Sequence, residues 1–328
     1  MRVSILMTVY NGMPYLPAAI ESVLNQTVID FEFIIVNDGS TDGTADYLAS
    51  LTDSRVRIFE QENGGTAVAA NNGLRHCVGE FIARMDADDI SLPHRLATQV
   101  EFLRTHPNVG LVGAQMAPLG DVGVGPSLNL PTTHDAIFSA LMEGRHGLAH
   151  SCILFRASLL NQIGGYWSVP LVDDWDMMIR MGEVSQLANI DEVLHHYRVH
   201  MGSLNGKGMR RMRLSIDYAC ERARRRQQGA LEMSHKSFIA ERNRRPLVVR
   251  VLEVVDLHAR CQYRLAIAER YGGRPIRATL RMIWAALLAP RLTCQRMGRI
   301  WQERFVKRRA PFVHSPQSAT PTSNVGWR

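Results

Sequence analysis

The stretch G-E-F-I-A-R-M-D-A-D-D, residues 79–89, joins a short apolar run to a cluster of acidic side chains. The apolar run has the length and composition of a buried strand, and Asp86, Asp88 and Asp89 follow it directly. Carboxylates two residues apart in an extended segment or tight turn point the same way, so two of them can approach one cation. Oxygen ligands of this kind suit Mg²⁺ or Mn²⁺, which in turn can hold a diphosphate. The alternative is that one aspartate caps a helix beginning near Ser91 while the others face water.

Apolar runs of strand length alternate with helix-like segments through the first 116 residues. The expected strands lie at 3–9, 31–37, 56–60, 81–85 and 109–116, and the expected helices at 16–24, 40–51, 66–77 and 93–104. Alternation at this spacing predicts an α/β fold with right-handed crossovers and a mostly parallel sheet flanked by helices. Ligands bind such sheets outside the carboxyl ends of the strands, which is where the aspartates fall.

The pattern is less regular after residue 116. Residues 117–150 are rich in Gly and Pro, and we expect them to form a mobile loop over the site. Further elements are expected as a strand at 153–156, a short helix at 157–163, a helix at 173–181 and a strand at 193–199. Long arginine-rich helices are expected beyond residue 206, and the composition after Pro311 is typical of disorder. These changes predict three parts, at 1–205, 206–310 and 311–328.

The composition is that of a globular protein, with 46% of the 328 residues hydrophobic and 21% charged. No window of about 18 residues is free of charge, which argues against a membrane-spanning helix. The N-terminal run lacks the pattern of a secretory signal. Five scattered cysteines without a C-x-x-C pair favour a reducing compartment over a disulfide framework or a zinc site. Together these features predict a cytoplasmic location.

The net charge of +7 conceals an uneven distribution. Residues 1–200 hold 11 Lys and Arg against 23 Asp and Glu, a net charge of −12, whereas residues 201–328 hold 27 against 8, a net charge of +19. A basic extension on an acidic body indicates contact with something anionic. Binding to nucleic acid is disfavoured, because the extension lacks a recognised motif and the acidic body would repel phosphates.

Other polar groups follow the neighbouring expected strands. Asp38 lies in V-N-D-G-S-T-D, where its carboxylate could accept a hydrogen bond from a nucleobase and Ser40 is a good helix N-cap. Taken alone, this segment is an ordinary turn. The glycines at 64–65 and 120–125 lack the P-loop and dinucleotide-binding spacings, which argues against both of those enzyme classes.

Two further groups of residues leave alternatives open. Asp173 and Asp174 begin an expected helix, where acids either compensate the helix dipole or, for one of them, act as a general base; Arg180 could pair with Asp176 one turn on. His200 ends an expected strand and is either an ordinary surface histidine or a metal ligand beside Asp88.

Taken together, these segments resemble glycosyltransferase family 2, whose members are inverting enzymes with a GT-A (Rossmann-like) fold that use nucleotide sugars. The resemblance is carried by S-I-L-M-T-V-Y-N-G (4–12), I-I-V-N-D-G-S-T-D-G-T (34–44), N-G-G-T-A-V-A-A-N-N-G-L (63–74), G-E-F-I-A-R-M-D-A-D-D (79–89), I-G-G-Y (163–166), V-D-D-W-D-M-M-I-R (172–180) and Y-R-V-H (197–200). It covers about residues 1–205, and the order and spacing of several motifs make it specific.

The resemblance implies roles for individual residues. The nucleotide sugar would be bound by Thr8, Tyr10, Asp38, Asn71 and Asp86, with Asp38 on the base and Asp86 on the ribose or phosphate. Asp88 would ligate Mg²⁺ or Mn²⁺, with His200 completing the shell. Asp174 would be the catalytic base, with Asp173 as the alternative.

Two positions depart from the family pattern. Asp173 stands where the family usually has Glu, and this shorter acid reaches its partner less well. Ala70 stands before Asn71 where the family often has Arg, so one contact near the diphosphate is missing. The identity of the sugar nucleotide is therefore left open.

The resemblance also implies a function. We expect a sugar to move from a UDP-, dTDP- or GDP-linked donor to a glycan or lipid-linked acceptor, in synthesis of cell-surface polysaccharide or glycolipid. A non-catalytic relative that only binds the sugar nucleotide is the alternative. The basic segments at 276–284 and 285–292 either rest peripherally on an anionic membrane surface or form a helical cap on the catalytic part.

Overall fold

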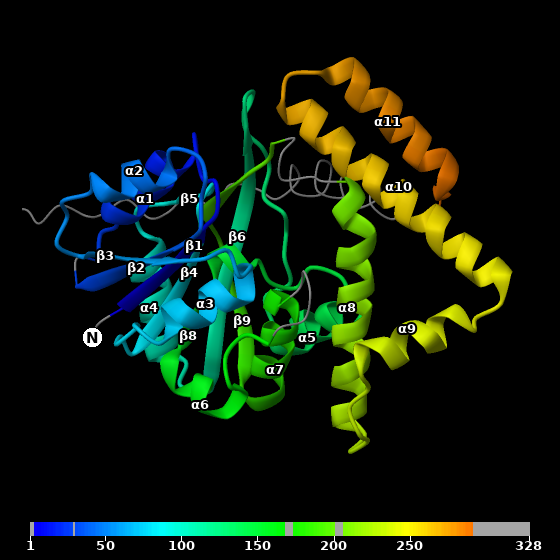
Figure 1. Cartoon of the computed structure of the whole chain (residues 1–328), viewed down its shortest axis with the longest axis horizontal. Helices are drawn as coiled ribbons and strands as arrows, with labels where there is room; N and C mark the ends of the chain where they lie inside the picture. Colours follow the sequence, from blue (N-terminus) through cyan, green and yellow to red (C-terminus); the bar gives the residue numbers. More distant parts are fainter. Residues whose placement is uncertain (1–2, 29, 168–172, 201–205, 291–328) are drawn as a thin grey trace, which may run out of the picture.

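A computed structural model describes residues 3–28, 30–167, 173–200 and 206–290 (Figure 1). It shows a curled mixed sheet with helices on both faces, followed by four helices that lie to one side of it. The expected α/β class and the helical C-terminal region are confirmed. The expected tail after residue 310 lies outside the described residues.

The N-terminal half of the sheet is parallel. Its strands are β1 (Val3–Val9), β2 (Phe31–Asp38), β3 (Val56–Gln61) and β4 (Phe81–Asp86), in the spatial order β3-β2-β1-β4, and they are connected by α1 (Leu16–Leu24), α2 (Thr44–Ala49) and α3 (Thr66–Leu74). Every residue of β2 is buried, which explains the apolar run at residues 33–36. Thr8 on β1 pairs with Val36 and with Asp86 across the two neighbouring strands. The polar ends of the central strands therefore meet at one edge.

The other half of the sheet is mixed and continues the order as β4-β8-β6-β9-β5. Its elements are β5 (Ile90–Ser91), α4 (Arg95–Thr105), β6 (Val109–Gly120), β7 (Gly123–Val124), α5 (His134–Met142), β8 (Leu154–Arg156), α6 (Leu160–Ile163), α7 (Asp173–Val184) and β9 (Gln186–Arg198), with short 3₁₀ turns at His150–Cys152 and Ala157–Leu159. The long strands β6 and β9 are parallel, while β8 and β5 run antiparallel to their neighbours. This pairing brings the end of β9, and with it His200, back to the end of β4.

The prediction of an irregular loop at residues 117–150 is wrong in part. Strand β6 continues to Gly120, and α5 forms within this segment. Ile137, Ala140 and Leu141 are buried at helical spacing, so packing against the core stabilises a helix that the flanking Gly and Pro residues obscured. Strand β9 likewise begins at Gln186, well before the expected start at residue 193.

Ser40 is not the N-cap of the second helix. Helix α2 begins at Thr44 with Gly43 at the N-cap position, and no side chain caps it. The Ser40 hydroxyl instead accepts a hydrogen bond from the backbone N–H of Asn11 at 2.9 Å. The loops that follow β1 and β2 are therefore tied together beside the site, which is a tertiary contact that the local turn pattern does not reveal.

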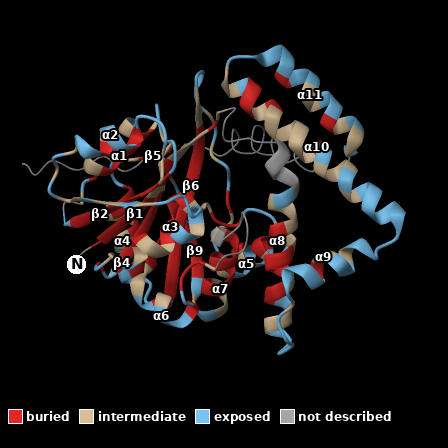
Figure 2. Ribbon diagram, viewed as in Figure 1, coloured by how far each residue is buried: buried red, intermediate tan, exposed pale blue. Residues whose placement is uncertain are grey.

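The C-terminal helices are α8 (Gly206–Gln227), α9 (His235–Asn243), α10 (Leu247–Tyr271) and α11 (Pro275–Leu288). Helix α8 packs against α7, and several of its side chains share one hydrophobic core with α5 and α7 (Figure 2). Helices α10 and α11 form an antiparallel pair farther from the sheet (Figure 1). Tyr271 at the end of α10 accepts a hydrogen bond from the Val122 backbone N–H at 3.2 Å, which joins this pair to the β6–β7 turn. Within the described part of the chain, no helix has the length and apolarity to cross a bilayer.

Candidate active site

A pocket of about 680 Å³ opens at the carboxyl ends of β1, β2 and β4. Its lining consists of Thr8, Val9, Tyr10, Asn11, Gly12, Met13, Tyr15, Asp38, Thr66, Ala69, Asp86, Ala87, Asp88 and His200. Six of the site residues named from the sequence are in this set, and they come from four separate segments of the chain. The fold therefore brings the N-terminal motifs and the late Y-R-V-H motif into one space.

The acidic turn after β4 is held in place through Asp89. Its buried carboxylate lies 2.8 Å from Nε2 of His195 and accepts a hydrogen bond from the Arg198 backbone N–H at 2.8 Å. Arg95, which can only donate, lies 3.5 Å from Nδ1 of His195, so Nε2 carries the proton and donates to Asp89. The alternative in which an aspartate caps the next helix is wrong, because His94 stands at the N-cap of α4 and no side chain caps that helix.

Asp86 and Asp88 are left to face the pocket. Oδ2 of Asp88 lies 3.1 Å from Nε2 of His200, and Oδ1 of Asp86 lies 3.7 Å from the guanidinium of buried Arg84. Enclosure by the protein raises the pKa of both carboxyls, and the negative charge of Asp89 raises each pKa further. Three neighbouring carboxylates that resist ionisation together favour a cation among them.

The donor set fits a divalent cation that is shared with a ligand. Among the described residues, no group of three or more His, Cys, Asp or Glu side chains is arranged to hold a metal ion. Asp88 and His200 supply two donors on one side of the pocket. Mg²⁺ is commonly bound by one or two carboxylates together with substrate phosphates, and Mn²⁺ also accepts carboxylate ligands. The residues present therefore suit a site that a diphosphate completes.

Asp38 lines the pocket, but its carboxylate also organises the loop after β3. Oδ1 accepts hydrogen bonds from the Gly64 backbone N–H and from Nε2 of Gln61, both at 2.8 Å, and Oδ2 accepts one from the Gly65 backbone N–H at 2.9 Å. Gly65 has a φ of +85°, which favours glycine at that turn. The expected contact of Asp38 with a base would have to share these acceptor oxygens.

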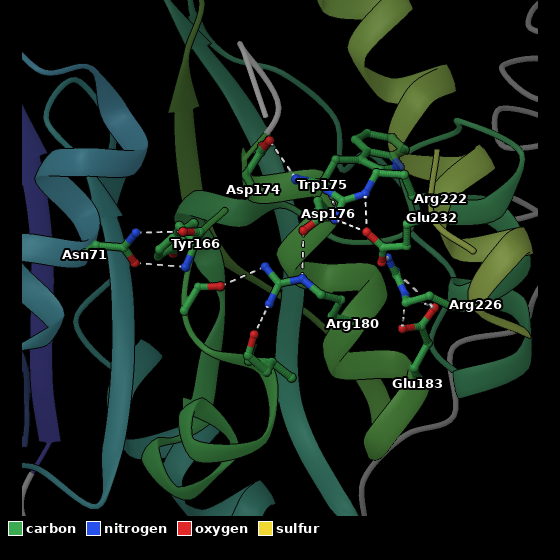
Figure 3. A network of polar contacts seen from close by, with 12 residues as sticks. Asn71, Tyr166, Asp174, Trp175, Asp176, Arg180, Glu183, Arg222, Arg226 and Glu232 are labelled. Atoms are coloured by element: carbon green, nitrogen blue, oxygen red, sulfur yellow. Dashed lines mark hydrogen bonds and ion pairs between the residues drawn. The ribbon is translucent and has the colours of Figure 1, made fainter. Parts of the chain in front are cut away.

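Asn71 and Asp174 are not among the described residues that line this pocket. The Asn71 side chain donates to the Tyr166 carbonyl at 2.6 Å and accepts from the Tyr166 backbone N–H at 2.9 Å (Figure 3). Oδ1 of Asp174 accepts from the Trp175 backbone N–H at 2.7 Å at the start of α7. The side chain of Asp173 lies outside what the structure describes.

A buried polar network holds the backbone of residues 163–166 against α7 and α3 (Figure 3). Arg180 donates to the carbonyls of Ile163 and Gly165 and pairs with buried Asp176 at 2.7 Å, as the i, i+4 spacing predicted. Arg222 of α8 lies 3.8 Å from the same aspartate and pairs with Glu232. Both arginines also stack on Trp167. The Arg180 guanidinium lies 4.5 Å and the Arg222 guanidinium 4.2 Å from the centroid of its ring.

Sequence reasoning missed several residues that shape the pocket. Arg198 donates to the Asp88 carbonyl at 2.7 Å and stacks on Tyr15, with its guanidinium 4.7 Å from the ring centroid. Tyr15 also contacts His200, with 4.9 Å between ring centroids. Arg84 offered a readable signal, because a charged residue inside an otherwise apolar strand indicates a buried partner. No local pattern in the sequence indicates that Arg198 stacks on Tyr15, because the two side chains meet only in the folded chain.

Comparison with known proteins gives several similarities. The family model described as glycosyl transferase family 2 matches residues 4–164. EpsE of Bacillus subtilis (strain 168), which is named as a glycosyltransferase, is 34% identical over 205 residues, covering 60% of this chain and 73% of EpsE. The O-antigen biosynthesis glycosyltransferase WbnJ of Escherichia coli is 31% identical over 205 residues, covering 60% of this chain and 80% of WbnJ.

Two solved structures share the fold. S. aureus TarS 1-349 in complex with UDP aligns with a TM-score of 0.52 and 16% identity, covering 91% of this chain and 92% of that chain. The mannosyltransferase PcManGT from Pyrobaculum calidifontis, in complex with GDP-Man and Mn²⁺, aligns with a TM-score of 0.54 and 19% identity, covering 93% of this chain and 81% of that chain. At these identities the alignments support the GT-A architecture alone.

Proposed function

We propose a reaction for this chain, which belongs to glycosyltransferase family 2. It transfers a sugar from a nucleoside diphosphate donor to an acceptor hydroxyl with inversion at the anomeric carbon. The donor is a UDP-, dTDP- or GDP-linked sugar, and the acceptor is a glycan or a lipid-linked glycan of the cell surface. The reaction takes place in the cytoplasm. One observation carries this proposal: Thr8, Asp86, Asp88 and His200 converge on one pocket at the strand ends.

The pocket suits the nucleotide end of the donor. Thr8, Tyr10 and Asp38 are among the lining residues and would contact the nucleoside, and Asp86 would contact the ribose or phosphate. Asp88 and His200 would hold Mg²⁺ or Mn²⁺. A divalent cation there stabilises the negative charge that develops on the departing diphosphate. Asn71 would support the site indirectly, because its side chain holds the backbone of Tyr166.

The acceptor side uses a single carboxylate. Asp174, at the first turn of α7, takes the proton from the acceptor hydroxyl, and Asp173 is the alternative base. The hydroxyl oxygen forms the new bond to the anomeric carbon while the bond to the diphosphate breaks on the opposite face. One displacement of this kind inverts the configuration and forms no glycosyl-enzyme intermediate, so no second nucleophilic carboxylate is required. Arg180 and Asn71 support this step by fixing the loop and helix that carry the base.

The experiment that tests the proposal measures binding and product separately. The unfolding temperature would be measured with UDP, dTDP and GDP, each with and without Mn²⁺, since a ligand that binds the folded state raises stability with its occupancy. We expect one nucleotide to stabilise the chain, and more strongly with Mn²⁺. NMR of the product made from the matching α-linked donor should show a β-linkage. Stabilisation without transfer to any acceptor would instead indicate a non-catalytic binding protein, and stabilisation by none of the three would contradict the proposal.

A further inference from the structure

Helix α11 buries two of its alanines and exposes most of its large apolar side chains, while Met282 and Leu288 are partly exposed. Ala278 and Ala285 are buried against α10, at 6% and 1% exposed. The large apolar side chains of the helix remain in contact with water: Ile276 at 77%, Leu280 at 63%, Ile283 at 53%, Trp284 at 50% and Leu287 at 70% exposed. Positions 276, 280, 283 and 287 share one face of an α-helix. We call this stripe the outer face of α11.

The first turns of α10 extend this apolar surface. Leu247, Val248, Val251 and Leu252 are between 52% and 70% exposed. Nε1 of Trp284 lies 3.4 Å from Nε2 of His258, and Arg281 donates to Gln262 at 2.8 Å, so α11 runs back along α10 and ends before these turns. Figure 2 shows both segments largely exposed. Two exposed apolar segments of this kind on neighbouring helices of a folded chain indicate a binding partner.

The charges around this surface are mostly positive. Arg274 and Arg277 are exposed at the start of α11, and Arg250 is exposed in the first turns of α10. By sequence alone, residues 291–310, which follow α11, hold seven Lys and Arg and one Glu. Two copies of the chain meeting through this surface would bring these positive charges together. A partner with an apolar interior and an anionic surface would complement both the apolar side chains and the surrounding positive charges.

We propose that the outer face of α11 and the first turns of α10 dock on an anionic lipid bilayer. Interfacial helices insert aliphatic and tryptophan side chains at the depth of the headgroups and acyl boundary, while arginines at their edge contact anionic headgroups. Ile276, Leu280, Ile283 and Leu287 are the inserting side chains, and Trp284 lies at the interface. Arg277, on the edge of the stripe, contacts the headgroups.

Docking in this orientation holds the sugar-transfer site beside the membrane. The end of α10 contacts the β6–β7 turn, and a cavity of about 160 Å³ between them is lined by His200, Arg198, Glu269 and Arg274. The same His200 lines the larger pocket that holds Asp88. A lipid-linked acceptor in the bilayer would therefore lie near the site. The docking itself does not require the proposed reaction, so the two can fail separately.

The test uses the full-length chain and vesicles of defined lipids. We expect it to co-sediment with phosphatidylcholine vesicles that contain phosphatidylglycerol and to remain in the supernatant with phosphatidylcholine alone. The triple variant Leu280→Gln, Ile283→Gln, Leu287→Gln should bind the anionic vesicles at least about tenfold more weakly, because three inserting aliphatic side chains are lost. The matched control Val78→Gln, Val184→Gln, Leu231→Gln changes three exposed apolar residues elsewhere and should bind as the unaltered chain does.

Each outcome decides the proposal. Thermal unfolding of both triple variants checks that they fold, and transfer to a water-soluble acceptor should be the same in both. Absence of binding to anionic vesicles, or an equal loss in the two triple variants, would overturn the docking. A dimer in light scattering that the α11 variant alone converts to monomer would assign the surface to a second copy and would also overturn it.

Discussion

In the proposed reaction Asp174 would act on the acceptor hydroxyl and Asp88 on the departing diphosphate, so their loss should have different consequences. We expect Asp174→Asn to bind the nucleoside diphosphate with Mn²⁺ as the unaltered chain does, because Asp174 is not among the described residues that line the nucleotide pocket. Sugar transfer should fall by about 10²–10⁴-fold, the usual contribution of a general base. Thermal shift measures the binding and single-turnover kinetics measure the transfer.

Two comparison variants make this test specific. Asp88→Asn should lose the Mn²⁺-dependent part of nucleotide binding, since in the proposed site Asp88 would offer the cation a carboxylate beside His200. Asp173→Asn separates the two adjacent acids, and the one whose loss leaves binding intact while removing transfer is the base. A parallel loss of donor binding and transfer in Asp174→Asn would refute its assignment as the base.

His150 should make stability depend on pH. Burial, and the nearby positive charge of Arg84, lower the pKa of His150 well below 6.5, and Nε2 of its ring lies 2.8 Å from the hydroxyl of Tyr166. Below pH 6.5 the unfolded chain therefore binds a proton at this histidine that the folded chain does not, so the free energy of unfolding falls as the pH falls. At pH 5.5 this single group should remove about 1.4 kcal/mol.

The measurement is urea unfolding between pH 8 and 5.5 for the unaltered chain and for His150→Gln. The difference between the two curves isolates His150, because other buried groups, His195 among them, titrate in both proteins. The difference should shrink as the pH falls below 6.5. The exposed His94→Gln serves as the matched control and should run parallel to the unaltered chain. Parallel curves for His150→Gln as well would show that His150 binds its proton equally in the folded and unfolded states, which would contradict the lowered pKa.

At the scale of elements, α7 and α8 are joined by charge as well as by apolar packing. Arg222→Ala should lower the free energy of unfolding by about 2–4 kcal/mol, because it removes a nearly buried guanidinium from Asp176, Glu232 and the ring of Trp167. Arg225→Ala, which breaks only a partly exposed pair with Glu221 on the same helix, should cost less than about 0.5 kcal/mol. Urea unfolding of the two variants gives both values.

A double-variant cycle identifies the source of the effect. If Arg222 acts through Glu232, the combination of Arg222→Ala and Glu232→Gln should cost less than the sum of the two single changes. Additive costs would leave stacking on Trp167 as the main contribution. Equal, small costs for Arg222→Ala and Arg225→Ala would show that the network does not hold the catalytic helix.

The elements differ in how well the sequence predicts them. Strands β1, β2 and β4 and helix α1 follow from local apolar runs and turn residues, because a strand buried on both faces is mostly apolar. The convergence of Asp38, Asp86 and Asp88 follows from the rule that parallel strands present their carboxyl ends together. Local pattern and topology were sufficient for this part of the site.

Contacts between distant residues could not be predicted in this way. Asp89 is fixed by the backbone of Arg198, which is 109 residues away in the chain, and Asp176 meets Arg222 of another helix. Helix α5 is stabilised by burial of Ile137 and Leu141, although glycine and proline dominate its flanks. In each case a tertiary contact decides the structure, and the local sequence is compatible with other outcomes.

At the scale of the whole molecule, helix α8 belongs physically with the catalytic part. Ile216, Ala219, Cys220 and Ala223 are buried in the same core as Trp175 and Met178 of α7, and Arg226 pairs with Glu183 at 3.0 Å. We therefore propose that the boundary at residue 205, which separates the family motifs from the basic extension, is not a boundary of folding. The separable part is the pair of α10 and α11, in which α10 packs on α8 and its end contacts the β6–β7 turn.

This leads to a test with two shortened chains. A chain ending at residue 205 would lose the apolar face of α8, and with it the contacts of Arg222 with Asp176 and of Arg226 with Glu183, so it should aggregate or unfold without cooperativity. A chain ending at Arg245 keeps α8, α9 and every residue that lines the nucleotide pocket in the described structure. It should unfold cooperatively and still be stabilised by the nucleotide with Mn²⁺, but it should no longer sediment with anionic vesicles. Circular dichroism melting, thermal shift and sedimentation separate these properties. A stable, nucleotide-binding 1–205 chain would show instead that α8 merely covers a catalytic domain that is already complete.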